Sequence, residues 1–261
     1  MKVAFIGFGN MAQAITRAWL SAEVLAPEDI YACARRYERL EQNCQRLGVQ
    51  PCKTPAEATA GAEVVVIAVK PYQIADVCGP IVDLLKTKTV ISLAAGMPYE
   101  KLKTILPGVP VISAIPNTPI SVGAGILVCE EENSLSQDQK ALVVRLFEPV
   151  ALIVGVDSAH LSIAGTIGGC SPAFAALFIE ALADAGVKYG LTRQLSYELS
   201  AKVLEGTGKL FLKEGGHPGQ LKDAVCSPGG TTIKGVCALE HDGFRGDIIG
   251  AIEAIEDASK A

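Results

Sequence analysis

The chain has 261 residues, of which 49% are hydrophobic and 20% are charged, and its formal net charge is −5. This much apolar material is enough for a full core and excludes a largely disordered chain. The small negative charge, with no dense cluster of Lys and Arg, argues against a nucleic-acid-binding surface.

The first half of the chain alternates between short apolar runs and segments of helical periodicity. The predicted strands are 2–7, 30–34, 64–69, 89–93, 109–114 and 150–156, and the predicted helices include 11–20, 37–47 and one that opens with a capping box at 136–139. Almost purely apolar strands suit a parallel sheet covered by helices on both faces. Residues 1–156 are therefore predicted to form a Rossmann-like, doubly wound α/β domain that binds a dinucleotide.

The first predicted strand leads directly into a G-x-G-x-x-A motif. In such a motif Gly7 permits the tight turn, Gly9 lets the backbone approach a pyrophosphate, and Ala12 lets the helix pack on the strand. The motif alone is weak evidence, but here a strand precedes it and a helix follows. The predicted cofactor contacts in this turn are Gly7, Phe8, Gly9, Asn10 and Met11.

The end of the second predicted strand indicates which dinucleotide binds. An NAD site places a carboxylate there for the ribose hydroxyls, whereas this strand is followed by Arg35 and Arg36. The nearest acids, Glu28 and Asp29, precede the strand and lie at its other end. Two guanidinium groups can bind a 2′-phosphate, so NADPH is favoured and NADH is the alternative. The other interpretation is that both arginines begin the solvated face of the next helix.

Three further turns follow predicted strands, at the sheet edge where open α/β folds bind ligands. The candidate cofactor contacts that they supply are Ala68, Val69, Lys70 and Pro71, then Ala94, Ala95 and Gly96, then Asn117. The charge run at 130–133, in contrast, is interpreted as a solvated turn.

The second half of the chain, residues 157–261, is predicted to be entirely helical, with helices at 193–214, 231–241 and 244–260. The segment 172–183 carries one charge in twelve residues, so a helix there is apolar nearly all round. Such a helix must be buried on every side, and a segment of this size cannot do that alone. The segment is therefore predicted to form a subunit interface.

Other residue patterns exclude several classes of site. The eight cysteines include no C-x-x-C pair, and the three histidines lie far apart, so neither a metal site nor hydrolytic chemistry is expected. The cysteines are expected to be reduced, as in cytoplasmic proteins. No signal peptide is recognised, and no apolar stretch is expected to reach the length needed to span a bilayer. The protein is accordingly predicted to be soluble and cytoplasmic, without a membrane partner.

Longer motifs resemble one enzyme family. They are AVKP at 68–71, SLAAG at 92–96, IPNTP at 115–119, SPAFAALFIEALADAGVKYGL at 171–191 and HPGQLKDAVCSPGGTTI at 217–233. Together they resemble pyrroline-5-carboxylate reductase over essentially the whole chain. The G-x-G motif occurs in many folds, whereas the last of these motifs is much more specific.

The resemblance implies NAD(P)H-dependent reduction of 1-pyrroline-5-carboxylate to L-proline, the last step of proline synthesis. It also implies a homodimer with interlocked all-α domains, often assembled further into a decamer. The implied substrate pocket comprises Ser227, Gly229, Gly230, Thr231 and Thr232. In this family the substrate carboxylate meets backbone N–H groups and a hydroxyl of this loop, and Thr232, the implied catalytic residue, would hydrogen-bond the ring nitrogen.

Some positions depart from the family pattern. Gly168 and Cys170 stand where Ser is common, Phe174 where Tyr is usual, and Ile115 where Met is usual. The family's Asn near the adenosine has no clear counterpart in the stretch 53–55.

Two other functions fit the sequence less well. A β-hydroxyacid dehydrogenase needs a Lys on the first interdomain helix, and residues 161–187 contain none. A non-catalytic NADP-binding protein would be expected to lose the substrate loop, which is kept here.

Overall fold

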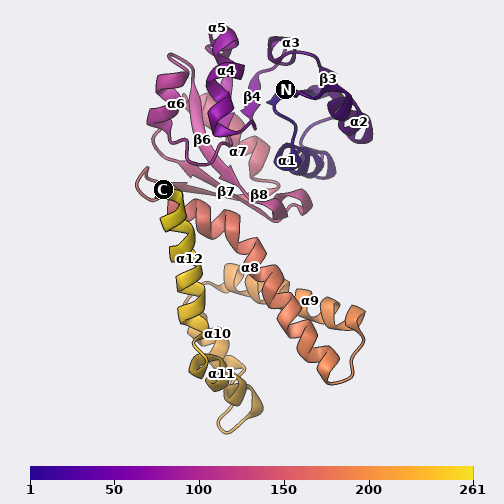
Figure 1. The fold of residues 1–261 in the computed structure, drawn as a ribbon, viewed down its shortest axis with the longest axis vertical. Coiled ribbons are helices and arrows are strands. Elements are labelled where there is room, and N and C mark those ends of the chain that lie inside the picture. The colour runs from indigo at the N-terminus through magenta and orange to yellow at the C-terminus, as the bar shows by residue number, and fades with distance from the viewer. Residues whose placement is uncertain (261) are drawn as a thin grey trace. The chain divides into compact units, whose positions relative to one another are not determined.

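A computed structural model describes residues 1–260. The chain divides into two compact units, Met1–Pro172 and a second unit that begins at Ala173. Figure 1 shows the strands gathered in the first unit and helices alone in the second.

The first unit contains an eight-stranded sheet with the order β3-β2-β1-β4-β5-β6-β7-β8. The strands are β1 (Val3–Ile6), β2 (Ile30–Cys33), β3 (Gln50–Cys52), β4 (Val64–Ile67), β5 (Thr89–Ser92), β6 (Val111–Pro116), β7 (Gly125–Glu130) and β8 (Ala151–Val156). All neighbouring strands pair in parallel except β6 and β7, which are antiparallel. The predicted fold class is confirmed, although two strands, β3 and β7, were not predicted.

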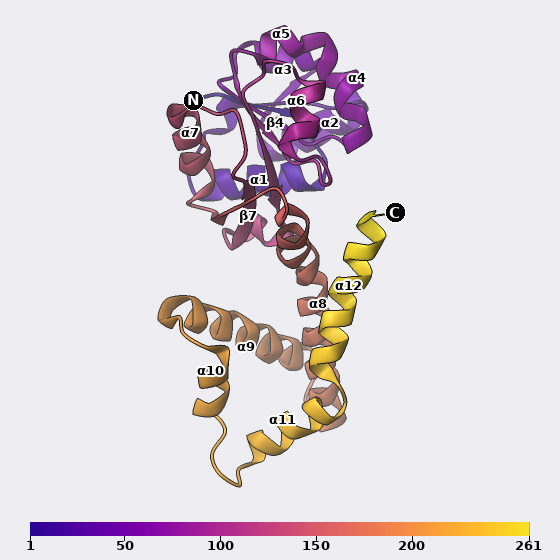
Figure 2. The same cartoon turned by 90° about the vertical axis from the view of Figure 1, so that its left-hand side faces the viewer.

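Helices cover the two faces of the sheet (Figure 2). The strands and helices form two separate hydrophobic cores. The helices of this unit are α1 (Asn10–Ser21), α2 (Tyr37–Leu47), α3 (Pro55–Ala60), α4 (Ile74–Cys78), α5 (Val82–Leu85), α6 (Tyr99–Ile105) and α7 (Gln137–Phe147). Residues of α1, α2 and α7 belong to one core, and residues of α3 to α6 belong to the other. Trp19 lies in the first core, where its indole N–H donates to the Leu146 carbonyl at 2.7 Å. The helices pack on the two faces of the sheet and leave the carboxyl ends of its strands uncovered, where open α/β folds bind ligands.

The interpretation of 130–133 as a solvated turn is wrong at Glu130. This residue ends β7 and is 1% exposed. Its carboxylate accepts hydrogen bonds from the Tyr99 backbone N–H at 2.6 Å and from the Ser158 hydroxyl at 2.5 Å. A buried carboxylate needs such donors, and one of them lies at the start of α6, where the helix dipole also favours negative charge.

The second unit consists of the later part of α8 (Leu161–Lys188), then α9 (Arg193–Glu214), α10 (Pro218–Ala224), α11 (Thr231–His241) and α12 (Phe244–Lys260). The predicted apolar segment 172–183 lies inside α8, which continues through Pro172. Helix α8 is long and apolar enough to cross a membrane by length and composition alone, so the expectation that no stretch has this length is wrong. Core helices of soluble proteins pass the same test.

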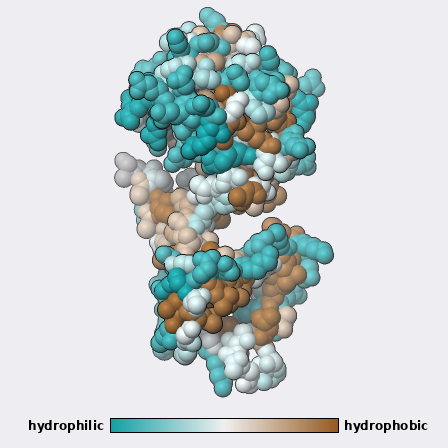
Figure 3. All heavy atoms as spheres, turned by 90° about the vertical axis from the view of Figure 1, so that its right-hand side faces the viewer, coloured by the Kyte–Doolittle hydropathy of each residue, from teal (hydrophilic) through white to brown (hydrophobic). Residues whose placement is uncertain are grey.

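The second unit buries very few of its residues. Between 173 and 259, the buried residues are Ala183, Ser196 and Ser200. Large apolar side chains are exposed along its helices, among them Leu177 and Leu212, and Figure 3 shows hydrophobic side chains gathered on this surface. Apolar surface on this scale is typical of a chain that buries it against another copy or partner.

Candidate cofactor cleft and loop

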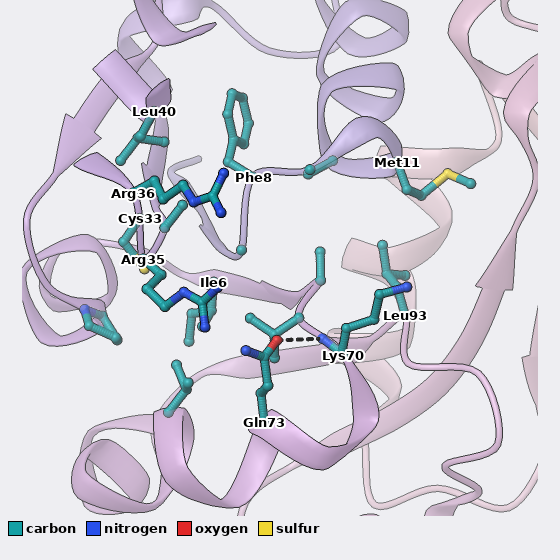
Figure 4. A pocket seen from close by; sticks show the side chains of 18 of the residues that line it. Ile6, Phe8, Met11, Cys33, Arg35, Arg36, Leu40, Lys70, Gln73 and Leu93 are labelled. Carbon is teal, nitrogen blue, oxygen red and sulfur yellow. Dashed lines mark hydrogen bonds between the residues drawn. The ribbon is translucent and has the colours of Figure 1, made fainter. Parts of the chain in front are cut away.

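A cleft of about 1200 Å³ lies at the carboxyl ends of the strands in the first unit. It is lined by the turns that follow β1, β2, β3, β4 and β5 (Figure 4). Its size exceeds that of an ordinary small-molecule pocket, which is about 300–1,000 Å³, and fits an extended ligand such as a dinucleotide.

The glycine turn between β1 and α1 is built by close backbone contacts. Gly7 has φ +94°, and its N–H donates to the Cys33 carbonyl at 2.9 Å. A Cβ atom at Gly7 would lie 2.7 Å from the Ala68 carbonyl oxygen, so no other residue fits without a shift of the backbone. The first glycine therefore has the role that the sequence predicted for it.

Gly9, in contrast to Gly7, has open space around it. It is the N-cap of α1 with φ −82°, no side chain caps the helix, and no atom lies within 4 Å of where its Cβ would be. The first N–H groups of α1 are thus open to the cleft, and a helix N-terminus of this kind attracts an anion. Because the space beside Gly9 is open, a pyrophosphate can approach the backbone at this site.

A network of polar side chains, not predicted from the sequence, supports the glycine turn. Gln13 is buried, donates to the Phe8 carbonyl at 3.2 Å and accepts from Arg46 at 2.7 Å. Arg46 also donates to Asn43, which lines the cleft. The network links α1 and α2 to the backbone that faces the ligand.

The two arginines after β2 lie at the cleft and extend into it from the end of the strand (Figure 4). Both are exposed, and none of the ion pairs among residues 1–260 involves them. Glu28 and Asp29 belong to a short 3₁₀ helix before β2, at the opposite end of that strand. Two cations without a carboxylate partner are therefore available to a ligand at this end of the cleft.

The turns after β4 and β5 line the other end of the cleft, as Ala68, Val69, Lys70, Pro71, Leu93, Ala94 and Ala95. The Lys70 backbone N–H donates to the Gln73 side chain at 3.2 Å, which closes this turn (Figure 4). Its ammonium group points toward Leu93 in the same view.

Two of the predicted cofactor contacts are not among the residues that line the cleft. Gly96 lies just past the lining turn, and Asn117 is buried. The Asn117 amide donates to the Gly168 carbonyl at 2.9 Å, and its oxygen accepts from the Ile126 N–H at 2.9 Å. Its side chain thus joins the end of β6 to β7 and to the first part of α8.

Several residues of the cleft were missed because they follow an unpredicted strand or lie inside helices. They are Arg39, Asn43, Lys53, Thr54, Pro55, Ala56, Gln73, Asp76, Val77, Pro80 and Ile81. From the sequence, the stretch 53–55 only lacks the family's Asn, whereas in the structure all three residues line the cleft.

The loop before α11 is a tight turn in the second unit. The Gly230 N–H donates to the Ser227 carbonyl at 3.0 Å, with Pro228 and Gly229 in the two central positions. Gly229 has φ +72°, as the second central residue of a type II turn requires. A Cβ at Gly230 would meet the Ser227 hydroxyl at 2.5 Å. The turn therefore requires glycine at 229, whereas a side chain at 230 would require the Ser227 hydroxyl to rotate away.

The same turn leaves the start of α11 open. Gly230 is the N-cap and no side chain caps the helix, while Thr231 and Thr232 are exposed in the first turn. Free N–H groups, the helix dipole and two hydroxyl groups therefore lie together, and this set of donors is suited to a carboxylate.

The cysteines and the acidic residues supply no candidate metal site in the described part of the chain. All eight cysteines are unpaired, and burial raises the pKa of Cys33 to about 11 and the pKa of Cys44, Cys78 and Cys129 to about 12. Within residues 1–260 no group of three His, Cys, Asp or Glu residues could hold a metal ion.

Comparison with known proteins gives a consistent result along the chain. Residues 158–261 match the family described as "Pyrroline-5-carboxylate reductase dimerisation", and residues 2–96 match "NADP oxidoreductase coenzyme F420-dependent". A pyrroline-5-carboxylate reductase of Treponema pallidum is 44% identical over 99% of this chain and 100% of its own length. One of Synechocystis is 35% identical over 97% of this chain and 95% of its own. The crystal structure of a Plasmodium falciparum pyrroline carboxylate reductase with NADP bound is 30% identical, with a TM-score of 0.89, and covers 100% of this chain and 97% of that one.

Proposed function

The chain belongs to the pyrroline-5-carboxylate reductase family, and we propose on that premise that it reduces 1-pyrroline-5-carboxylate to L-proline with NADPH. The observation that carries the proposal is the pairing of two features in one chain. One is a dinucleotide cleft with an open glycine turn and free arginines, and the other is an uncapped helix start beside two glycines and two threonines. The reaction forms the last step of proline synthesis.

The residues of the cleft fit NADPH from end to end. The turn 7–11 would hold the pyrophosphate through the N–H groups of α1, and Arg35 and Arg36 would bind the 2′-phosphate. The turns 68–71 and 94–95 would then lie beside the nicotinamide. When bound, the nicotinamide supplies the hydride that the reduction needs. We keep Gly96 and Asn117 as proposed cofactor contacts, although neither lines the cleft.

The loop 227–232 would hold the substrate. Its N–H groups and the Ser227 hydroxyl would bind the carboxylate, and the protonated ring nitrogen would donate a hydrogen bond to the Thr232 hydroxyl oxygen. The reduction adds a hydride to the carbon of a C=N bond, and the nitrogen keeps its proton. A protonated imine already carries that proton, so the chemistry requires no strong general acid. The residues of this chain would contribute by binding and orienting the substrate ring for hydride transfer.

We further propose that residues 157–261 form the association and substrate domain and residues 1–156 the cofactor domain. The apolar surface between 173 and 259 would be buried against a second copy, and dimers could be units of a decamer. The eight unpaired cysteines support a reducing, cytoplasmic location.

Light scattering at micromolar concentration is expected to give at least twice the 27.3 kDa mass of one chain. The reason is that a single copy leaves its large apolar side chains in water, at a cost of about 25 cal/mol for each Å². A mass of one chain, independent of concentration, would contradict this part of the proposal.

The proposed activity is tested by initial rates of NADPH and NADH oxidation with 1-pyrroline-5-carboxylate. Turnover with both and a lower KM for NADPH is expected, because Arg35 and Arg36 have no carboxylate beside them. A preference for NADH would contradict the assigned role of the arginines. Absence of turnover with either cofactor would contradict the reductase proposal.

A further inference from the structure

We propose that Lys53 and Arg39 complete the binding site for the 2′-phosphate and set the preference for NADPH together with Arg35 and Arg36. This inference rests on the proposed function, because it deepens the cofactor specificity of the same cleft. The site would be a pocket of four cations for a dianionic phosphate monoester on a ribose.

The register of the sheet places Lys53 at this position. Strands β2 and β3 pair in parallel, with Cys33 opposite Cys52. The next residues along the two strands, Ala34 and Lys53, therefore leave the sheet side by side at its carboxyl edge. Both line the cleft, and Lys53 is exposed. Lys53 thus approaches from β3 the same end of the cleft that Arg35 approaches from β2.

Arg39 reaches this end of the cleft from α2. Arg36 is the N-cap of that helix, and Arg39 follows three residues later, so both lie on one face of its first turn. Leu40 next to it is buried and anchors the helix against the sheet. Arg39 lines the cleft and is exposed, and it takes part in none of the ion pairs found in the described part of the chain.

The carboxylates nearby do not neutralise these cations. Glu57 accepts a hydrogen bond from the Lys53 backbone N–H at 2.8 Å and lies in the first turn of α3, where the helix dipole also favours it. It does not line the cleft. The carboxylate that does line it, Asp76, belongs to α4, which follows β4 rather than β2 or β3. The cleft therefore has an excess of positive charge at the ends of β2 and β3.

A phosphate dianion fits this excess better than a pair of ribose hydroxyl groups does. Arg guanidinium groups bind phosphate oxygens in pairs, and Lys adds a point charge on a flexible stem. Removing one of four partly exposed charges is expected to weaken 2′-phosphate binding about tenfold, which corresponds to about 1.4 kcal/mol. It should leave the binding of a ligand without that phosphate nearly unchanged.

The test measures binding by calorimetry to the full-length protein, with adenosine 2′,5′-bisphosphate and adenosine 5′-monophosphate as the two probes. The variants are Lys53→Gln and Arg39→Gln, each with a charge-preserving partner, Lys53→Arg and Arg39→Lys. The matched controls are Lys86→Gln and Arg17→Gln, which remove exposed charges that do not line the cleft.

The expected result has three parts. Wild type binds the bisphosphate more tightly than the monophosphate. Each Gln variant loses about tenfold in affinity for the bisphosphate and less than twofold for the monophosphate. The charge-preserving variants Lys53→Arg and Arg39→Lys and both controls bind the two probes as wild type does. Equal affinity of wild type for the two probes, equal losses for both probes, or no loss would overturn the inference. These measurements report binding and need no turnover. Absence of reductase activity would therefore contradict the proposed reaction and leave the inference about the 2′-phosphate site unaffected.

Discussion

Replacing Thr232 by Val is expected to lower kcat/KM for 1-pyrroline-5-carboxylate by about 10²- to 10³-fold, the usual loss when one positioned hydrogen bond to a reacting group is removed. Thr232 lies exposed in the first turn of α11, where the chain offers free N–H groups and hydroxyls. Val keeps the shape of Thr and lacks only the hydroxyl. The ring would then bind without a partner for its nitrogen, and its orientation toward the cofactor would be lost.

The matched variant is Thr232→Ser, which restores the hydroxyl and is expected to recover most of the activity. NADPH binding, followed by fluorescence titration, and the mass in solution should stay as in wild type for both variants, because the glycine turn of the cofactor lies in the other unit. Unchanged kcat/KM in Thr232→Val would remove Thr232 from the mechanism. Loss of association in both variants would assign it a structural role instead.

The second large effect is expected from Gly7→Ala, which should lower the free energy of unfolding by about 3 kcal/mol. The new methyl group would lie 2.7 Å from the Ala68 carbonyl oxygen, in a backbone conformation with φ +94°. Both the strained φ and the backbone clash contribute. Calorimetry should show a thermal midpoint lower by about 6–12 °C for a domain of this size.

Gly9→Ala is the matched control, since it adds the same methyl group two residues later. No atom lies within 4 Å of that position, so the thermal midpoint should stay within a few degrees, with a small cost at the N-cap. The methyl would instead occupy the approach to the α1 N–H groups, and NADPH affinity should fall at least about tenfold. Similar stability losses in the two variants, or unchanged NADPH affinity in Gly9→Ala, would contradict the roles given to these glycines.

Strands that are apolar throughout were predicted well because a parallel sheet buries both of their faces. Strand β3 was missed because it is three residues long and contains Gln50 and Pro51, which carry no apolar signal of their own. Strand β7 was missed for another reason. A βαβ pattern expects a helix between strands, whereas β6 and β7 are antiparallel and joined by the 3₁₀ helix Thr118–Val122. Local composition identifies most of such a sheet, and pairing across the sheet determines the rest.

The cofactor cleft was predictable to the extent that its residues directly follow apolar strands. The turns after β1, β2, β4 and β5 were found in this way, whereas Lys53 needed the register of β3 and Arg39 needed the face of α2. Glu130 looked like part of a charged turn, and its burial follows from donors at Tyr99 and Ser158, which lie 31 and 28 residues away. The substrate loop was predicted only through the family resemblance. Its chemistry depends on free backbone N–H groups, which cannot be inferred from the types of residue in the sequence.

Hydride transfer from NADPH to the C=N carbon of 1-pyrroline-5-carboxylate can be followed by isotope labelling. The purified full-length protein is incubated with the substrate and NADPH carrying deuterium at the reactive C4 position, and the product is analysed by mass spectrometry and NMR. The expected product is L-proline with one deuterium, located at C5. Proline without deuterium, deuterium at another carbon, or no proline at all would contradict it.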